Sequence, residues 1–122
     1  MIKIDKEKNL LFYNTYVPYD CVNSRNFCSQ IKSVCKELAD VFEKHNIDIE
    51  KPWELSPVKL KNTTEYISCQ YLVFGECPDD FKMKAGNVIV RKELGNYPST
   101  KGFDQPNFVL DFAITLPNVI KK

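Results

Sequence analysis

Three observations on this 122-residue sequence predict an α+β fold, an antiparallel sheet of about five strands with one long amphipathic helix packed on one face. Apolar residues recur at three- and four-residue spacing over residues 24–45, which is typical of a helix covering a core. Apolar and polar residues alternate over 108–116, and residues 65–75 also follow a period of two, as strands do. The expected order is β-α-β-β-β-β, which favours an antiparallel sheet. A chain of this length builds one core, so residues 1–122 are expected to form a single domain.

The N-terminal half is predicted to hold a strand and then the helix. Residues 9–19 are dense in aromatic and β-branched side chains and include a proline near their end, so a strand is expected there. The helix follows over residues 24–45, with Asn23 or Ser24 as its N-cap. His45 lies in its last turn, where the helix dipole favours a positive charge.

The remaining strands are predicted from short apolar segments between turns. Two prolines after the helix favour an extended connection into a short strand at 58–60. Residues 65–75 have apolar side chains on both faces, so they are expected to form a central strand. A further strand is expected at 88–94, and the last and most regular one at 108–116. The segment 95–107 between them is read as a loop because of its glycines and prolines.

Charge and hydropathy exclude several classes of partner. With 17 basic and 16 acidic side chains the formal charge is +1, too small for the electrostatic attraction that nucleic acids require. No apolar run approaches the ~20 residues that cross a bilayer, so we expect no membrane association. The first residues are too charged for a signal peptide, and a cytoplasmic protein is expected.

The five cysteines and the single histidine make metal binding and catalysis poor explanations of this sequence. No C-x-x-C pair is present, so neither a zinc site nor a disulfide framework is expected, and the thiols are predicted to be reduced and mostly buried. A cysteine nucleophile needs a neighbouring base, and Cys35 is about ten helical residues, or ~15 Å, from His45. No cofactor motif is present either. We therefore expect no catalytic residues, no metal, no cofactor and no enzymatic activity.

Two acids inside predicted strands, Glu93 and Asp111, are the candidate binding residues. An unpaired buried carboxylate is costly, so each must face water, pair with a cation or receive a cationic ligand. Glu93 beside Arg91 and Lys92 fits a solvated edge, and Asp111 fits a solvent-exposed sheet face. The remaining alternative is a site for a lipophilic cation among aromatic rings. The candidate rings are Trp53, Tyr66, Tyr71 and Phe74, although aromatic residues at this density usually belong to the core.

Three short segments form a recognisable set, namely Glu65-Tyr66-Ile67-Ser68-Cys69-Gln70-Tyr71-Leu72-Val73, Ala85-Gly86-Asn87-Val88-Ile89-Val90 and Leu94-Gly95-Asn96-Tyr97. Together they resemble the gyrase-inhibitor-like (GyrI-like) effector-binding family. In that family a strand-helix-strand-strand module occurs twice, and the terminal strand, here 108–116, often carries an acid. Only ten residues separate Tyr97 from Phe108, too few for the family's second helix, so the resemblance is to a shortened member.

The resemblance implies a non-enzymatic cytosolic binding domain for an amphipathic, often cationic, small molecule. It makes Glu93 and Asp111 the acids of the site and Trp53, Tyr71 and Tyr97 its walls. The alternative is a protein-protein interaction module, such as an accessory or immunity-type protein of a bacterial toxin system, whose exposed sheet docks a partner chain. A second copy of the chain, forming a homodimer, is one candidate for that partner.

Overall fold

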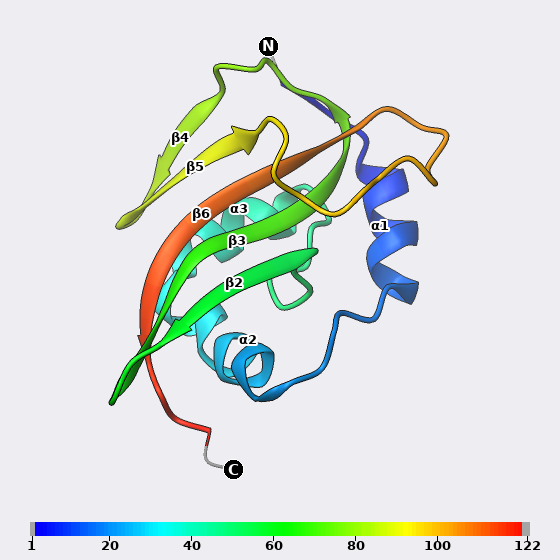
Figure 1. Cartoon of the computed structure of the whole chain (residues 1–122). Helices are drawn as coiled ribbons and strands as arrows, with labels where there is room; N and C mark the ends of the chain where they lie inside the picture. The colour runs from blue at the N-terminus through cyan, green and yellow to red at the C-terminus, as the bar shows by residue number, and fades with distance from the viewer. Residues whose placement is uncertain (1, 121–122) are drawn as a thin grey trace.

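The computed structural model describes residues 2–120, in which three N-terminal helices pack on a curled, six-stranded antiparallel half-barrel (Figure 1). The predicted α+β class is confirmed, whereas the predicted β-α-β order is wrong, because three helices replace the strand at 9–19 and the one long helix. The elements in chain order are β1 (Lys3–Ile4), α1 (Lys6–Thr15), α2 (Val22–Val34), α3 (Lys36–Lys44), β2 (Glu54–Lys59), β3 (Thr63–Glu76), β4 (Lys82–Ala85), β5 (Val88–Glu93) and β6 (Asn107–Pro117).

Strand β3 is the centre of the sheet. It pairs with β6 along one edge, and β5 and β4 continue the sheet beyond β6. The other edge of β3 is shared, because β2 pairs with residues 64–70 and the two-residue β1 pairs with Gly75 and Glu76. Within residues 2–120, no strand therefore lies beside residues 71–74 of β3 on that edge.

Helix α1 covers this gap, and it replaces the strand predicted at 9–19. The phenolic hydroxyl of Tyr13 donates to the carbonyl oxygen of Leu72 (2.6 Å), and the backbone N–H of Phe74 donates to Oδ1 of Asn9 (2.9 Å). Asp5 caps the helix by accepting a hydrogen bond from the backbone N–H of Lys8 (3.1 Å). The core side of α1, formed by the buried Asn9 and Tyr13 and the half-buried Phe12, has helical spacing, and its packing outweighs the strand preference of its aromatic residues.

The single helix predicted over 24–45 is two helices, α2 and α3, which meet at Cys35. Cys35 ends α2 and begins α3, with a non-helical backbone (φ −114°, ψ 57°). No glycine or proline lies between residues 23 and 45 to indicate this break. The predicted apolar stripe still faces the core, with Phe27, Ile31 and Leu38 fully buried. None of the helices within residues 2–120 is long and apolar enough to span a bilayer.

Four of the five predicted strands correspond to observed strands, and two observed strands, β1 and β4, were not predicted. The segments predicted at 65–75, 88–94 and 108–116 correspond to β3, β5 and β6, and the segment at 58–60 overlaps the end of β2. Strand β4 forms a tight hairpin with β5, for which the sequence analysis made no prediction. The two-residue turn between them uses Gly86 in a left-handed conformation (φ +61°), which glycine adopts without steric cost.

A β-bulge in β3 changes which of its side chains face the core. Tyr66 pairs with Ile114 of β6 and Cys69 pairs with Phe112, so two residues of β3, Ile67 and Ser68, oppose the single Ala113 of β6. The extra residue places both Tyr66 and Cys69 in the core and leaves Ile67 55% exposed on the opposite face. Simple alternation had put Tyr66 and Cys69 on different faces, and the bulge is why that prediction was wrong.

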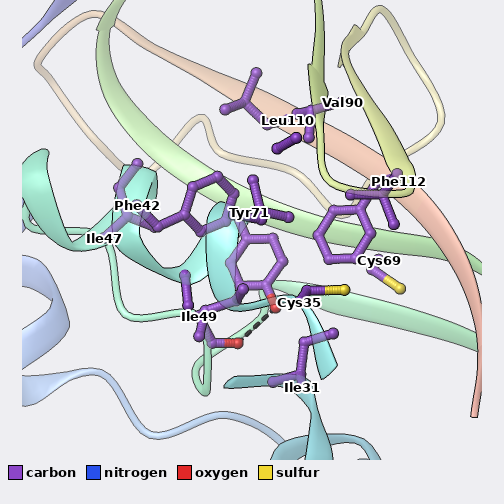
Figure 2. Close-up of a cluster of buried hydrophobic side chains, with 14 of the residues drawn as sticks. Ile31, Cys35, Phe42, Ile47, Ile49, Cys69, Tyr71, Val90, Leu110 and Phe112 are labelled. Carbon is purple, nitrogen blue, oxygen red and sulfur yellow. Dashed lines mark hydrogen bonds between the residues drawn. The ribbon is translucent and has the colours of Figure 1, made fainter. Parts of the chain in front are cut away.

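The main core lies between the helices and the concave face of the sheet. Tyr71 is at its centre, fully buried, with its ring stacked on Phe112 (centroids 5.8 Å apart) and edge-on to Phe42 (5.0 Å). Figure 2 shows its hydroxyl donating to the backbone carbonyl oxygen of Ile49 (2.6 Å). Every polar atom of this side chain is thus satisfied inside the core.

A smaller cluster lies on the opposite face of the sheet, here called the outer face. Leu72, Phe74 and Val109 are buried there under the loop of residues 94–106, which supplies Tyr97 and Phe103. Figure 1 shows this loop, in yellow and orange, crossing β3 and β6 on the side away from α2 and α3. One end of the outer face is thereby covered, and the other end is open to solvent.

All five cysteines are unpaired, as expected, but they are less buried than predicted. Cys35 and Cys69 are in the core, whereas Cys21, Cys28 and Cys77 are partly exposed. The burial of Cys69 strongly raises the pKa of its thiol. This is the opposite of what a cysteine nucleophile requires.

Candidate functional site

An acidic groove on the outer face, where the loop of residues 94–106 meets the sheet, is the candidate site. It has a volume of about 740 Å³ and is lined by β2, β3, β5, β6 and the loop. Its lining holds the three carboxylates of Glu54, Glu93 and Asp111, and no lysine, arginine or histidine of the described chain. We call it the outer-face groove.

Asp111, in the middle of β6, is hydrogen-bonded to residues at the bulge of β3. Its carboxylate accepts hydrogen bonds from the Ser68 hydroxyl (2.7 Å) and from the backbone N–H of Cys69 (3.2 Å). The bulge frees that N–H from the regular strand ladder, and Asp111 satisfies it. Burial, together with the nearby Glu93 carboxylate, raises the pKa of Asp111 despite these hydrogen bonds. The predicted position of Asp111, on the face away from the phenylalanines of its strand, is confirmed.

Glu93 ends β5 and holds the first turn of the loop. Its Oε2 accepts hydrogen bonds from the backbone N–H groups of Leu94, Gly95 and Asn96, at 3.2, 3.3 and 3.2 Å. Slight burial would raise the pKa of Glu93, but these N–H groups favour its charged form and the pKa is lowered. Glu93 therefore stays ionised under conditions in which Asp111 begins to take up a proton.

Gln70 of β3 links Asp111 to the loop of residues 94–106, and the sequence analysis missed it. Its Nε2 donates to the carbonyl oxygen of Asn96 (2.6 Å) and, more weakly, to Oδ2 of Asp111 (3.4 Å). The side chain lines the groove and is only 3% exposed, yet its Oε1 has no hydrogen-bond partner within the described residues. An unsatisfied buried acceptor is costly, so it suggests a missing donor. The only sequence signal was an amide between two apolar residues of a central strand.

The structure separates the three aromatic residues predicted as walls. Tyr97 lines the groove, half-buried, beside Asn96 and Pro98. Trp53 lies next to the groove rather than in it. Its indole N–H donates to the carbonyl oxygen of Pro98 (3.2 Å), and its ring packs on Phe12, Tyr16 and Phe103. Tyr71 is not part of the groove, because the pleat of β3 directs it to the core side.

The groove therefore brings together Glu93, Tyr97 and Asp111 from the predicted set and adds Glu54 and Gln70 to them. The hydrogen-bonding positions that these polar groups leave unused are mainly acceptors, because carboxylates and an amide oxygen accept hydrogen bonds and donate none. Such a set suits a ligand rich in N–H donors and positively charged.

This fold and groove define an α+β domain with an acidic surface site. The chain matches no protein-family model, no curated protein and no solved structure. Its function is therefore argued from the groove itself.

Proposed function

We propose that the protein is a binding domain for a small organic cation, held in the outer-face groove. The observation that carries the proposal is the conjunction of three carboxylates, no neutralising cation in the lining, and the unpartnered buried Oε1 of Gln70. An ammonium or guanidinium group supplies both the missing charge and the missing donors. The resemblance to the gyrase-inhibitor-like family is compatible with this proposal but remains a prediction.

A binding role is favoured over catalysis by the state of the candidate nucleophile and base. The raised thiol pKa of the buried Cys69 opposes its activation. His45, the only histidine, ends α3, where burial and the nearby Lys6 and Lys44 lower its pKa. Neither residue lines the groove.

The expected affinity is modest. The groove is open on one side, and Oε1 of Gln70 has almost no accessible surface, so a ligand reaches it only after the loop of residues 94–106 shifts. Ordering a ligand and a loop opposes binding, which makes dissociation constants in the micromolar range or weaker the expectation. The same shift of the loop would disturb the hydrogen bond between Trp53 and Pro98, so binding should change Trp53 fluorescence.

The test compares a cation with a neutral molecule of the same shape. Phenethylamine should quench or shift Trp53 fluorescence on titration, and 2-phenylethanol should bind far more weakly. Glu93→Gln and Asp111→Asn keep the shape of the groove and remove one charge each. Each substitution is expected to make the binding of phenethylamine less favourable by about 1 to 2 kcal/mol and to leave the binding of 2-phenylethanol unchanged.

Glu65→Gln is the matched control, because Glu65 is an exposed acid on β3 that does not line the groove. It should have no effect on either compound. Failure of both groove variants to discriminate the cation from the alcohol contradicts the proposal. The exposed Ile67 and Ile89 would then become the first surface to mutate in a search for a partner chain or a second copy of this one.

A further inference from the structure

Arg91 of β5 places a positive charge at the side of the acidic groove. It is the register partner of Asp111 on β6 and lies two residues before Glu93, so all three side chains share the outer face. Directly opposite side chains of neighbouring strands are about 5 Å apart at Cβ. A basic group is thus adjacent to both acids without lining the groove that they form.

Arg91 has no partner of its own among the described residues. The two ion pairs found between residues 2 and 120 are Arg25 with Asp20 and Lys92 with Asp79. Asp111 is instead engaged by Ser68 and Cys69, and Glu93 by the backbone of the loop. The exposed guanidinium of Arg91 therefore keeps its donors free for an external anion.

A second hollow, of about 390 Å³, extends the groove past Arg91. Ile67, Glu93 and Asp111 line both spaces, so the hollow continues directly from the groove. Its remaining lining includes Ile89, Arg91 and Ala113. Ile67 is 55% and Ile89 47% exposed, which leaves apolar surface next to the charged groups.

We propose that the cation bound by this protein is a zwitterion with an apolar side chain, of the class of free α-amino acids. The ammonium group faces Glu93 and Asp111, the carboxylate faces Arg91, and the apolar side chain lies on Ile67 and Ile89. This inference rests on the proposed function, because it assigns the cationic part of the ligand to the same groove. It adds an anionic part, which a simple amine lacks.

Arg91 would act differently if it only balanced the charge of the acids. Its removal would then strengthen the binding of every cation and would not distinguish ligands with a carboxylate from ligands without one. In the zwitterion site, its removal weakens only the ligands that carry a carboxylate. The two roles therefore predict opposite effects of one substitution.

The experiment measures binding of three compounds that share one side chain, by calorimetry or Trp53 fluorescence. L-Phenylalanine carries both charges, L-phenylalaninamide only the positive one, and N-acetyl-L-phenylalanine only the negative one. Phenylalanine should bind tightest, the amide about tenfold more weakly, and the N-acetyl compound not at all. Arg91→Gln should lower the affinity for phenylalanine to that for phenylalaninamide, and it should not lower the affinity for phenylalaninamide.

Lys36→Gln is the matched control, because it removes an exposed cation from α3, which lines neither hollow. It should leave all three affinities unchanged, and melting curves should show that both variants fold. The zwitterion assignment is overturned, and the cation site stands, if phenylalaninamide binds as tightly as phenylalanine. The same conclusion follows if Arg91→Gln changes the affinities for phenylalanine and for phenylalaninamide by the same factor. If neither phenylalanine nor phenylalaninamide binds, the proposed cation site is contradicted as well.

Discussion

The backbone N–H of Phe74 in β3 donates a 2.9 Å hydrogen bond to Oδ1 of Asn9 in α1, a side chain with no solvent exposure. The Nδ2 of the same amide donates to the carbonyl oxygen of His45 (3.0 Å), at the end of α3. One buried side chain thus satisfies a strand edge and a helix end together. These hydrogen bonds let α1 pack against the part of the β3 edge that has no neighbouring strand within residues 2–120.

Asn9→Ala should destabilise the protein by about 2 to 3 kcal/mol, because it leaves the buried N–H of Phe74 and the partly buried carbonyl of His45 without their partner. The expected result is a lower melting temperature and a lower urea midpoint with an unchanged slope. Asn14→Ala in the same helix is the control, since Asn14 is exposed, and it should change stability little. Equal effects of the two substitutions would contradict the bridging role of Asn9.

Leu38→Ala should cost about 2 to 5 kcal/mol, because Leu38 of α3 is fully buried and its truncation leaves a cavity. Leu11→Ala in α1 removes the same atoms from a side chain that is 64% exposed, and should shift stability by no more than about 0.5 kcal/mol. Chemical denaturation of both variants measures the difference. An unchanged curve for Leu38→Ala would mean that the core face of α3 is assigned wrongly.

Cys21 should be the first thiol to react with iodoacetamide in the folded protein. Burial slightly opposes its ionisation, but hydrogen bonds from Ser24 and Asn23 at the start of α2 and the charge of Arg25 lower its pKa overall. Burial raises the pKa of Cys28 to about 11, so this thiol stays protonated. Peptide mass spectrometry after brief labelling at neutral pH identifies the modified residue.

The same labelling in denaturant should modify all five cysteines without prior reduction, since none is paired. A native-state label on Cys69 ahead of Cys21 would contradict the core position of β3. A count below five in denaturant would reveal a disulfide that the structure does not contain.

Binding of a cation such as phenethylamine should weaken on acidification through the titration of Asp111. Its pKa is raised by burial, so the carboxylate that attracts the ligand is protonated at a higher pH than an ordinary aspartate. Affinity is therefore full above that pKa and falls as the pH decreases through it, while the amine stays charged throughout. Fluorescence titrations over a pH series measure this dependence.

Asp111→Asn should bind more weakly and lose most of this pH dependence. Glu93→Gln should bind more weakly but keep it, because the lowered pKa of Glu93 leaves that group ionised over the same range. A wild-type affinity that is flat across the range would show that Asp111 does not face the ligand.

The local spacing of apolar residues was enough to predict the main strands of the sheet and the helix face that packs in the core. In β6 a strict period of two placed Phe108, Leu110 and Phe112 on the core side and Asp111 on the outer face, and the structure agrees. This works because the side chains of a strand alternate whatever lies around them. The same rule failed in β3 at Ile67, where the bulge, a product of pairing with both neighbours, adds a residue.

The sequence by itself therefore determined the α+β class, the central strands, the core stripe of α2 and α3 and the two candidate acids. Only the tertiary structure decided that residues 6–15 are helical, because that helix is held by bonds from Asn9 and Tyr13 to a distant strand edge. The same holds for the groove. Glu93 is 18 residues from Asp111 and 23 from Gln70 in the sequence, and they meet only because β5, β6 and β3 are neighbours in the sheet. Such long-range contacts depend on the packing of the whole chain, which no local spacing encodes.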